Sequence, residues 1–402
     1  MNTTVDVSLV EFRLEVRAWL EANCPASMRT PPREEEMVWG GAREQFVNQD
    51  AKAWFERMRM KAWICPVWPC KYGGAGLSHD ENRILQGELR AINARLPLMS
   101  FGISMLGPAL LEFASEAQKL EHLPKIARGE VRWCQGYSEP GAGSDLASVK
   151  TMAEEKSNHF LVNGSKIWTS HANLSDWIFC LVRSNRDVPK HQGISFLLID
   201  LSSPGVTMSP IELISGASVF CQTFFDNVKV PKINLIGELN RGWPIAKRLL
   251  HYERNMVSAI GGSTELGGKG RQLNEVAKRY VGEHEGRVAD EVIRDRVAEH
   301  NMNDKSFQLT LLRASQEARA GVTNPHLASM FKLYGTEQNQ RKYELMLDCM
   351  GVRALGWEGP EFDEKELRTA RQWLRSKANT IEGGTSEIQL NIIAKHILGL
   401  PD

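Results

Sequence analysis

One glutamate of this chain, Glu253, stands on the apolar stripe of a predicted helix. The stripe has small or apolar residues at steps of three and four, which an α-helix turns to one face: Ala246, Leu249, Leu250, Val257 and Ile260. Burying an unpaired carboxylate is costly. The position therefore predicts either a core glutamate paired with an arginine, or a catalytic base whose pKa burial would raise toward neutrality.

A second candidate is the glycine-rich segment YSEPGAGSDLASVK, residues 137–150. Gly141 and Gly143 free the backbone to approach a ligand, and two serines and an aspartate supply polar groups. The segment is not a dinucleotide fingerprint, because Leu146 stands at the third glycine position and no βαβ pattern surrounds it. On its own it is compatible with a ligand site or with a structural turn.

Two shorter segments add further groups. KIWTS, residues 166–170, ends a predicted strand with a tryptophan face and two hydroxyls, which suits a planar heteroaromatic ligand, although a tryptophan there could equally belong to the core. Near the end of the chain, Gly383 and Gly384 precede a predicted helix. The exposed amides of such a helix start can bind an anion, but a glycine turn before a capped helix explains the same pattern.

Several reaction classes lack their residues. The sequence has no His, Cys, Asp or Glu cluster with metal-ligand spacing, no GxSxG elbow and no GxxxxGK[ST] loop. Metal-dependent hydrolysis, serine hydrolysis and nucleotide phosphoryl transfer are therefore not expected. The seven cysteines are scattered without CxxC pairs, which predicts free thiols in the cytoplasm.

The composition predicts a multi-domain globular protein. Of the 402 residues, 42% are hydrophobic, enough for a large core. Lys plus Arg balance Asp plus Glu at 49 each, so no bulk charge attracts nucleic acid or an anionic membrane. No signal peptide and no run of about 18 apolar residues is present. We expect a cytoplasmic protein that does not insert into membranes.

The order of elements predicts an α+β fold with three parts. Helical periodicity dominates residues 1–129, the N-terminal helical domain, whereas strand-like stretches rich in β-branched and aromatic residues fill a central β domain, residues 130–239. Helical periodicity then returns through residues 240–402, with helices long enough for a bundle. No alternating βαβ pattern suggests a doubly wound sheet.

Together these segments resemble the acyl-CoA dehydrogenase family. The matching landmarks cover nearly the whole chain in the family's order: WPCKYGGAGLS, YSEPGAGSDLASVK, NGSKIWTS, VKVPKINLIGE and EGGTSEIQLNIIAKHILGLP. The resemblance implies an N-terminal helical domain, a central β domain and a C-terminal four-helix bundle, with FAD between sheet and bundle. It also implies α,β-dehydrogenation of an acyl-CoA thioester to the 2-enoyl-CoA. A carboxylate would remove the α-proton, a hydride would leave the β-carbon for flavin N5, and an electron-transfer flavoprotein would reoxidise the flavin.

The resemblance also assigns residues to the ligands. It implies cofactor contacts for Gln135, Tyr137, Ser138, Ser144, Trp168, Thr169, Ser170, Gly351, Thr385 and Glu387. It implies substrate contacts for Ser144, Arg254 and Gly384, and no metal.

The catalytic carboxylate departs from the commonest family pattern. Many members carry it as the glutamate of a Tyr-Glu-Gly-Thr run before the last helix, but alignment on Thr385 places Gly383 at that position. Other members use a glutamate in a Glu-Arg pair on the first bundle helix, which HYERNMVSAIGG matches. The resemblance thus makes Glu253 the base and Arg254 its neighbour, with Glu382 as the second choice.

Two family motifs that reach a partner subunit are degraded. The Arg-x-x-Phe-Gly loop is not recognisable in YVGEHEGRVADE, and the Gln-x-x-Gly-Gly run appears as DCMGV, in which only Gly351 remains. Family members are usually tetramers, and bacterial subsets with incomplete motifs work as heterotetramers. Two alternatives therefore remain: a half-site or non-catalytic subunit of a heterotetramer, and an oxidase or monooxygenase on the same scaffold.

The substrate is only loosely constrained. Glu382 and Gly383 stand in place of the family's aromatic-plus-carboxylate pair, which should leave room near the flavin and predicts branched, cyclic or steroid-like acyl groups in fatty acid or steroid catabolism.

Overall fold

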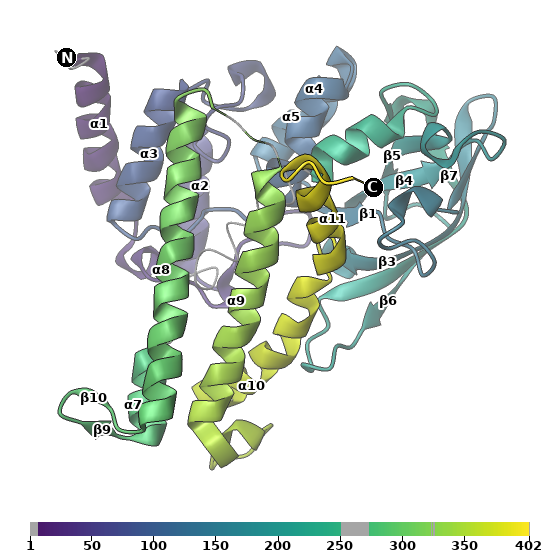
Figure 1. Ribbon diagram of the computed structural model, residues 1–402. Helices are drawn as coiled ribbons and strands as arrows, with labels where there is room; N and C mark the ends of the chain where they lie inside the picture. The colour runs from purple at the N-terminus through teal and green to yellow at the C-terminus, as the bar shows by residue number, and fades with distance from the viewer. Residues whose placement is uncertain (1–6, 251–272, 323, 325, 402) are drawn as a thin grey trace. The chain divides into compact units, whose positions relative to one another are not determined.

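The computed structural model describes residues 7–250, 273–322, 324 and 326–401. It divides into two compact units, residues 1–211 with 219–249, and residues 212–218 with 250–402. The first unit contains both the N-terminal helices and the β-sheet, and the second contains the C-terminal helices (Figure 1). The expected order of helices, sheet and helices is confirmed, whereas the boundaries of three separate domains stay a prediction.

The N-terminal part of the first unit is helical. Its helices are α1 Val7–Asn23, α2 Gln49–Met60, α3 His79–Ala91, a π-helical turn Gly102–Leu106, α4 Gly107–Phe113 and α5 Glu116–Ala127. Helix α3 begins at Ser78, which forms a capping box with Glu81, and α5 begins at Ser115, which forms one with Gln118. Gln118 also donates to the carbonyl oxygens of Ile233 and Leu235 at 2.7 Å each, which ties α5 to the end of the sheet segment. These bonds fix the helices relative to the strands that follow.

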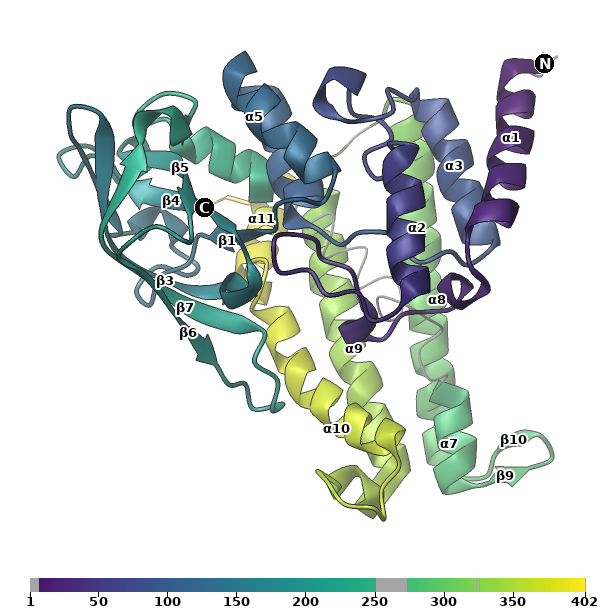
Figure 2. The same cartoon turned by 180° about the vertical axis from the view of Figure 1, so that it is seen from behind.

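The central part of the first unit is an eight-stranded sheet (Figures 1 and 2). Its strands are β1 Trp133–Gly136, β2 Met152–Glu155, β3 His159–Ser170, β4 Trp177–Arg183, β5 Ile194–Asp200, β6 Val206–Ile211, β7 Phe220–Pro231 and β8 Leu235–Ile236. They lie in the order β6-β7-β3-β2-β4-β5-β8, and β1 pairs with β4 in parallel. Apolar residues of β3, β4, β5 and β7 form the buried core, including Phe160, Ile178, Leu197 and Val228.

Helix α9 is the centre of the second unit. The elements there are α7 Leu273–Val281, β9 Glu283–His284, β10 Arg287–Val288, α8 Glu291–Arg319, α9 Leu327–Met350, α10 Glu364–Ser376 and α11 Ser386–His396. Helix α9 packs against α7, α8, α10 and α11. The expectation of uninterrupted helical structure is wrong at one place, because β9 and β10 form a hairpin. Its two-residue turn has positive φ at both Glu285 and Gly286, as a tight hairpin requires.

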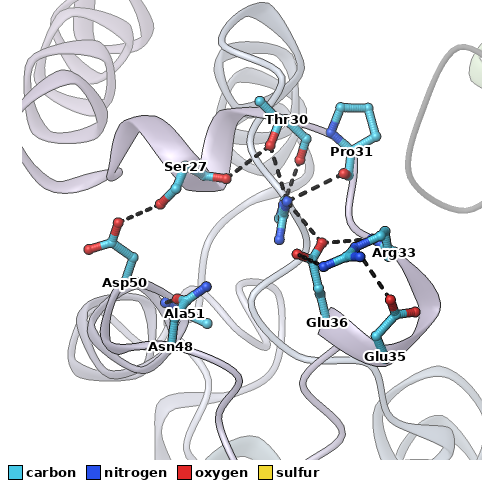
Figure 3. A network of polar contacts seen from close by, with 10 residues as sticks. Ser27, Thr30, Pro31, Arg33, Glu35, Glu36, Asn48, Asp50 and Ala51 are labelled. Atoms are coloured by element: carbon cyan, nitrogen blue, oxygen red, sulfur yellow. Dashed lines mark hydrogen bonds and ion pairs between the residues drawn. The ribbon is translucent and has the colours of Figure 1, made fainter.

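The loop that follows α1 is held by a polar network (Figure 3). The Glu36 carboxylate accepts a 2.8 Å hydrogen bond from the Arg33 backbone, and Arg33 also lies 3.3 Å from Glu35. Glu36 forms an ion pair of 3.2 Å with Arg95, whose guanidinium donates to the Thr30 carbonyl. The loop is thereby fixed just before Trp39.

Candidate functional site

A buried ion pair fastens the glycine-rich loop to strand β3. The Lys166 ammonium, which is fully buried, lies 2.7 Å from a Glu139 oxygen and also donates to the Tyr137 carbonyl at 3.0 Å. The Glu139 carboxylate further accepts from the backbone N–H groups of Lys150 and Thr151. Burial alone would raise the pKa of Glu139, but the charge and hydrogen bond of Lys166 and the two backbone donors outweigh it and lower this pKa.

The same contacts bring two predicted ligand segments side by side. The Ile167 N–H donates to the Ser138 carbonyl at 2.9 Å, directly before Trp168. The start of the 137–150 loop is therefore held against the end of β3. Tyr137 itself is buried, with its ring edge-on to Phe179 and Phe196.

Trp168 is exposed by an irregularity in β3. The register between β3 and β7 shifts between Lys166 and Thr169, and Trp168 takes φ 60°, a conformation that costs a non-glycine residue about 1–2 kcal/mol. Lys166 and Thr169 are both fully buried, whereas Trp168 is 51% exposed. A strained bulge that presents a large flat ring to solvent is typical of a ligand-binding position.

Thr169 faces the interior of the sheet. Its hydroxyl donates to the Cys221 carbonyl at 2.7 Å and lies 2.8 Å from the Thr223 hydroxyl. These bonds engage its side chain within the fold, so any contact of Thr169 with a ligand would come from its backbone. Ser170 is partly exposed at the end of the strand.

The glycines of the loop are not required by the fold itself. A Cβ added at Gly141 or Gly143 would meet no atom within 4 Å, and neither glycine has positive φ. Ser144, beside them, is exposed. The residue type there is accounted for if a ligand approaches the backbone closely. Gln135 lies nearby in the sequence, on β1.

In the second unit, two glycines form a turn that only glycine fits. Gly383 and Gly384 have φ of 65° and 93°, and a Cβ on Gly384 would lie 2.5 Å from the Gln389 amide nitrogen. The fully buried Lys332 of α9 donates to the Gly384 carbonyl at 2.6 Å, and Gln389 donates to the Gly383 carbonyl at 3.0 Å. Burial lowers the pKa of Lys332, and the charge of Glu382 opposes this.

Of the two predicted catalytic carboxylates, Glu382 is among the described residues. Glu253 and Arg254 lie outside the described residues. Both oxygens of Glu382 are engaged, by Arg375 at 2.8 Å and by Asn379 at 2.6 Å. A carboxylate held in this way is a poor acceptor for a substrate proton unless these bonds break.

A cleft at the start of α11 gathers further predicted residues. It has a volume of about 520 Å³, a size typical of small-molecule sites. Its lining residues come from α9, from the segment before α11 and from the first turn of α11: Glu337, Gln340, Arg341, Glu344, Thr380, Ile381, Thr385, Ser386 and Glu387. Thr385 caps α11 by accepting from the Ile388 N–H, and the backbone N–H of Glu387 lowers the pKa of that carboxyl group. Gly351, with φ 57°, ends α9.

Sequence reasoning missed the residues that hold these segments. Only Lys332 carries a signal, because it stands between the apolar residues Phe331 and Leu333. Lys166 follows Ser165 in the KIWTS segment and carries no such signal. Gln389 carried no signal of its own.

The described residues also limit other chemistry. No group of three or more histidine, cysteine, aspartate or glutamate side chains among them could hold a metal ion. None of their helices combines the length and apolar character that crossing a bilayer needs. All seven cysteines are free, as expected.

Three family models match the chain in succession. They describe the N-terminal domain of acyl-CoA dehydrogenases over residues 10–130, the middle domain over 134–228 and the C-terminal domain over 240–398. The chain is 34% identical to the acyl-CoA dehydrogenase IpdE1 of Mycolicibacterium smegmatis, over 98% of each chain.

Two solved structures are similar to this chain over its whole length. A structure described as the Tcur3481-Tcur3483 steroid ACAD is 28% identical, covers 100% of each chain and has a TM-score of 0.75. The ChsE4-ChsE5 complex from Mycobacterium tuberculosis is also 28% identical over 100% of each chain, with a TM-score of 0.72.

Proposed function

The chain belongs to the acyl-CoA dehydrogenase family, the flavin-dependent oxidoreductases that act on CH–CH bonds, and from that premise we propose that Glu253 removes the α-proton of its acyl-CoA substrate. This proposal rests on one observation: the alternative carboxylate, Glu382, already accepts hydrogen bonds from other side chains. Glu382 is held by Arg375 and Asn379, and the position before Gly384 offers only a glycine. Glu253 is then the remaining carboxylate that a family pattern assigns.

The residues of this chain have three tasks in such a reaction. An α-proton beside a thioester is weakly acidic, so donors must stabilise the enolate charge while water is kept out. The Gly384 amide and Arg254 are the proposed donors, and Lys332 and Gln389 hold the Gly384 turn in place. Bound FAD would supply the acceptor for the hydride that leaves the β-carbon.

Each unit, taken by itself, has features that fit part of the cofactor. In the first unit, Trp168 offers an exposed flat ring, and Gly141 and Gly143 have an open backbone that the fold does not require. We assign the ring contacts to Trp168 and Ser170, and the contacts of the 137–150 loop to Tyr137, Ser138 and Ser144. Thr385, Glu387 and the cleft of about 520 Å³ are assigned to the remainder of the cofactor. Gln135, Thr169 and Gly351 stay sequence-based predictions, Thr169 through its backbone.

One experiment separates the two carboxylates. Glu253→Gln and Glu382→Gln variants that retain flavin are mixed with a panel of acyl-CoAs, and flavin reduction is followed by stopped-flow absorbance. Loss of the base should slow reduction by roughly 10²- to 10⁴-fold in Glu253→Gln, while Glu382→Gln keeps a rate near wild type. Near wild-type reduction in Glu253→Gln, with reduction abolished in Glu382→Gln, would identify the other glutamate as the base.

A second candidate is a subunit whose flavin site is completed by another chain. The cleft is lined by three carboxylates, Glu337, Glu344 and Glu387, against the single cation Arg341, a poor balance for binding phosphate groups unaided. Two similar structures are described by pairs of chain names. Purification of the chain alone tests this candidate. A flavin-free protein that gains FAD only with a second chain supports a hetero-oligomer, and stoichiometric flavin in the isolated chain supports a site that needs no different chain.

The acceptor and the substrate class are tested on the same preparation. We propose that electrons pass to an electron-transfer flavoprotein, and rapid reoxidation by air would instead favour an oxidase or monooxygenase. The replacement of an aromatic-plus-carboxylate pair by Glu382 and Gly383, with the steroid description of a similar structure, favours branched, cyclic or steroid-like acyl groups. A preference for short linear acyl-CoAs in the panel would contradict this.

A further inference from the structure

Arg132 is a buried cation that precedes strand β1 and is 9% exposed. Among the residues that the structure describes, none forms an ion pair with its guanidinium or accepts a hydrogen bond from it. Burial lowers the pKa of Arg132. A guanidinium has five N–H donors, and those that the protein leaves without acceptors can bind water or a ligand. Such a group points to a ligand or to a special role in the fold.

The nearest carboxylates are used by the backbone. Asp176 accepts hydrogen bonds from the backbone N–H groups of Arg132 at 2.8 Å and Ala42 at 3.2 Å. Glu44 accepts from the N–H groups of Trp39 and Gly40 at 2.9 and 2.5 Å. Both carboxylates favour the charged form of Arg132 from a distance. Neither reaches its guanidinium, so the N–H donors stay available.

One aromatic ring covers this cation, and two further rings lie beside that ring. The Arg132 Cζ lies 4.7 Å from the centre of the Trp39 ring, so the indole covers one face of the guanidinium. The Trp39 ring in turn lies 5.0 Å from the His171 ring and 5.8 Å from the Phe101 ring. Covering a face leaves the N–H edge free, and that edge is the part that binds a planar oxyanion through two hydrogen bonds.

The frame around Arg132 is preorganised. Glu44 fixes the backbone at Trp39, and the Val38 carbonyl accepts from the Met99 N–H at 2.7 Å. The loop before Trp39 is held by the network of Figure 3. His171 has φ 52°, a strained value for this residue, and follows Ser170 directly in the chain. The frame is therefore built before any ligand arrives.

We propose that Arg132, framed by Trp39 and His171, binds a carboxylate carried by the acyl group of the substrate. The proposal rests on the proposed function and narrows its substrate class to acyl-CoAs with a second, carboxylate-bearing end. His171 adjoins Ser170, which is assigned to the flavin ring. An oxyanion at Arg132 therefore belongs to the part of the substrate near the reacting carbons, rather than to the phosphates at the far end of coenzyme A.

The binding test uses matched thioesters. Adipyl-CoA is compared with hexanoyl-CoA, and suberyl-CoA with octanoyl-CoA, by titration calorimetry and by flavin reduction. Wild-type protein should bind the carboxylate member of a pair more tightly. Arg132→Gln should weaken the binding of the carboxylate-bearing thioester by roughly 10- to 100-fold and leave the binding of the methyl-ended thioester unchanged. Arg132→Lys should recover only part of the preference, because it restores the charge without the planar fork.

A control variant and a control ligand separate carboxylate binding from binding of the coenzyme A phosphates. Arg128→Gln removes an exposed arginine paired with Glu130 and should change the binding of neither thioester. If Arg132→Gln weakens the binding of free coenzyme A to the same extent, the guanidinium binds a phosphate of coenzyme A and the proposal is wrong. Equal behaviour of the two members of each pair with the wild-type protein, including no binding of either, also overturns it. Flavin reduction by a methyl-ended acyl-CoA shows that the proposed function holds even where the carboxylate preference fails.

A stability measurement separates a ligand-binding arginine from a structural one. Arg132→Met removes the buried charge and keeps an apolar side chain against Trp39, so its melting temperature without ligand should equal or exceed that of the wild type. Suberyl-CoA should raise the melting temperature of the wild type and raise that of Arg132→Met much less. A large loss of stability in Arg132→Met would assign Arg132 to the fold and overturn the proposal.

Discussion

The Lys166 ammonium contacts the Glu139 carboxylate at 2.7 Å inside the first unit, and this pair joins the glycine-rich loop to the strand that presents Trp168. Both side chains are buried. The pair therefore links the stability of the unit to the geometry of the proposed flavin site.

Breaking this pair from one side should be costly. Lys166→Met leaves the Glu139 carboxylate buried with only its backbone donors, and removal of one partner of a buried pair costs about 3–5 kcal/mol. Replacing both residues, Lys166→Met with Glu139→Gln, should cost less than the sum of the single changes. Urea unfolding of the two single variants and the double variant measures the coupling. Strictly additive free energies would contradict an energetic link between the two residues.

The bond from Lys332 to Gly384 should control the turn before α11. Lys332→Met removes the 2.6 Å donor to that carbonyl, and we expect a loss of about 1–3 kcal/mol in the free energy of unfolding. Amide hydrogen exchange of residues 383–389 should become faster. Lys377→Met, which removes a partly exposed pair with Glu344, is the matched control and should cost less than about 1 kcal/mol. Unchanged exchange in Lys332→Met would show that Gln389 alone holds the turn.

Trp168 should contribute more to flavin binding than to the stability of the fold. Trp168→Gly removes a half-exposed ring and relieves the positive φ, so the unfolding free energy of the flavin-free protein should change by less than about 1 kcal/mol. Flavin bound per chain, measured by absorbance, should fall clearly. Trp357→Gly is the control, because Trp357 is also partly exposed but contacts Arg371 in the second unit. Full flavin content in Trp168→Gly would remove Trp168 from the proposed site.

Patterns among neighbouring residues were sufficient to predict the order of helical and strand regions along the chain. The change from helical to strand periodicity near residue 130, and back near residue 240, is a property of neighbouring residues. The hairpin at Glu285 and Gly286 was missed because its turn lacks the Asn-Gly or Asp-Gly pair that signals most such turns.

The site depends on contacts between distant residues, and these left no local pattern. Exposure of Trp168 follows from the shifted register between β3 and β7. The availability of the Arg132 guanidinium depends on Asp176 and Glu44 being engaged by backbone amides. The Lys332 bond spans 52 residues of sequence. Each of these requires the folded chain before it can be recognised.

The pKa of His171 gives a pH dependence with a definite sign. Burial, aided by the charge of Arg132, lowers the pKa of His171 to about 4, against about 6.5 in an unfolded chain. Between these values the unfolded state binds a proton that the folded state does not, so the unfolding free energy falls as the pH drops from about 6.5 toward 4. The contribution is at most about 1.4 kcal/mol per pH unit. Urea unfolding at several pH values should show this slope in the wild type.

Substitution at His171 and at its neighbour should alter the slope in different ways. His171→Gln should make the slope shallower. Arg132→Met removes only the charge contribution, and because burial is the larger cause, the pKa of His171 should rise in part but stay below 6.5. A carboxylate bound at Arg132 should raise the pKa of His171 in the wild type, since an anion beside an imidazole favours its protonated form. A histidine proton titration by NMR with and without suberyl-CoA measures this shift, and an unchanged pKa of His171 in the bound protein would place the carboxylate elsewhere.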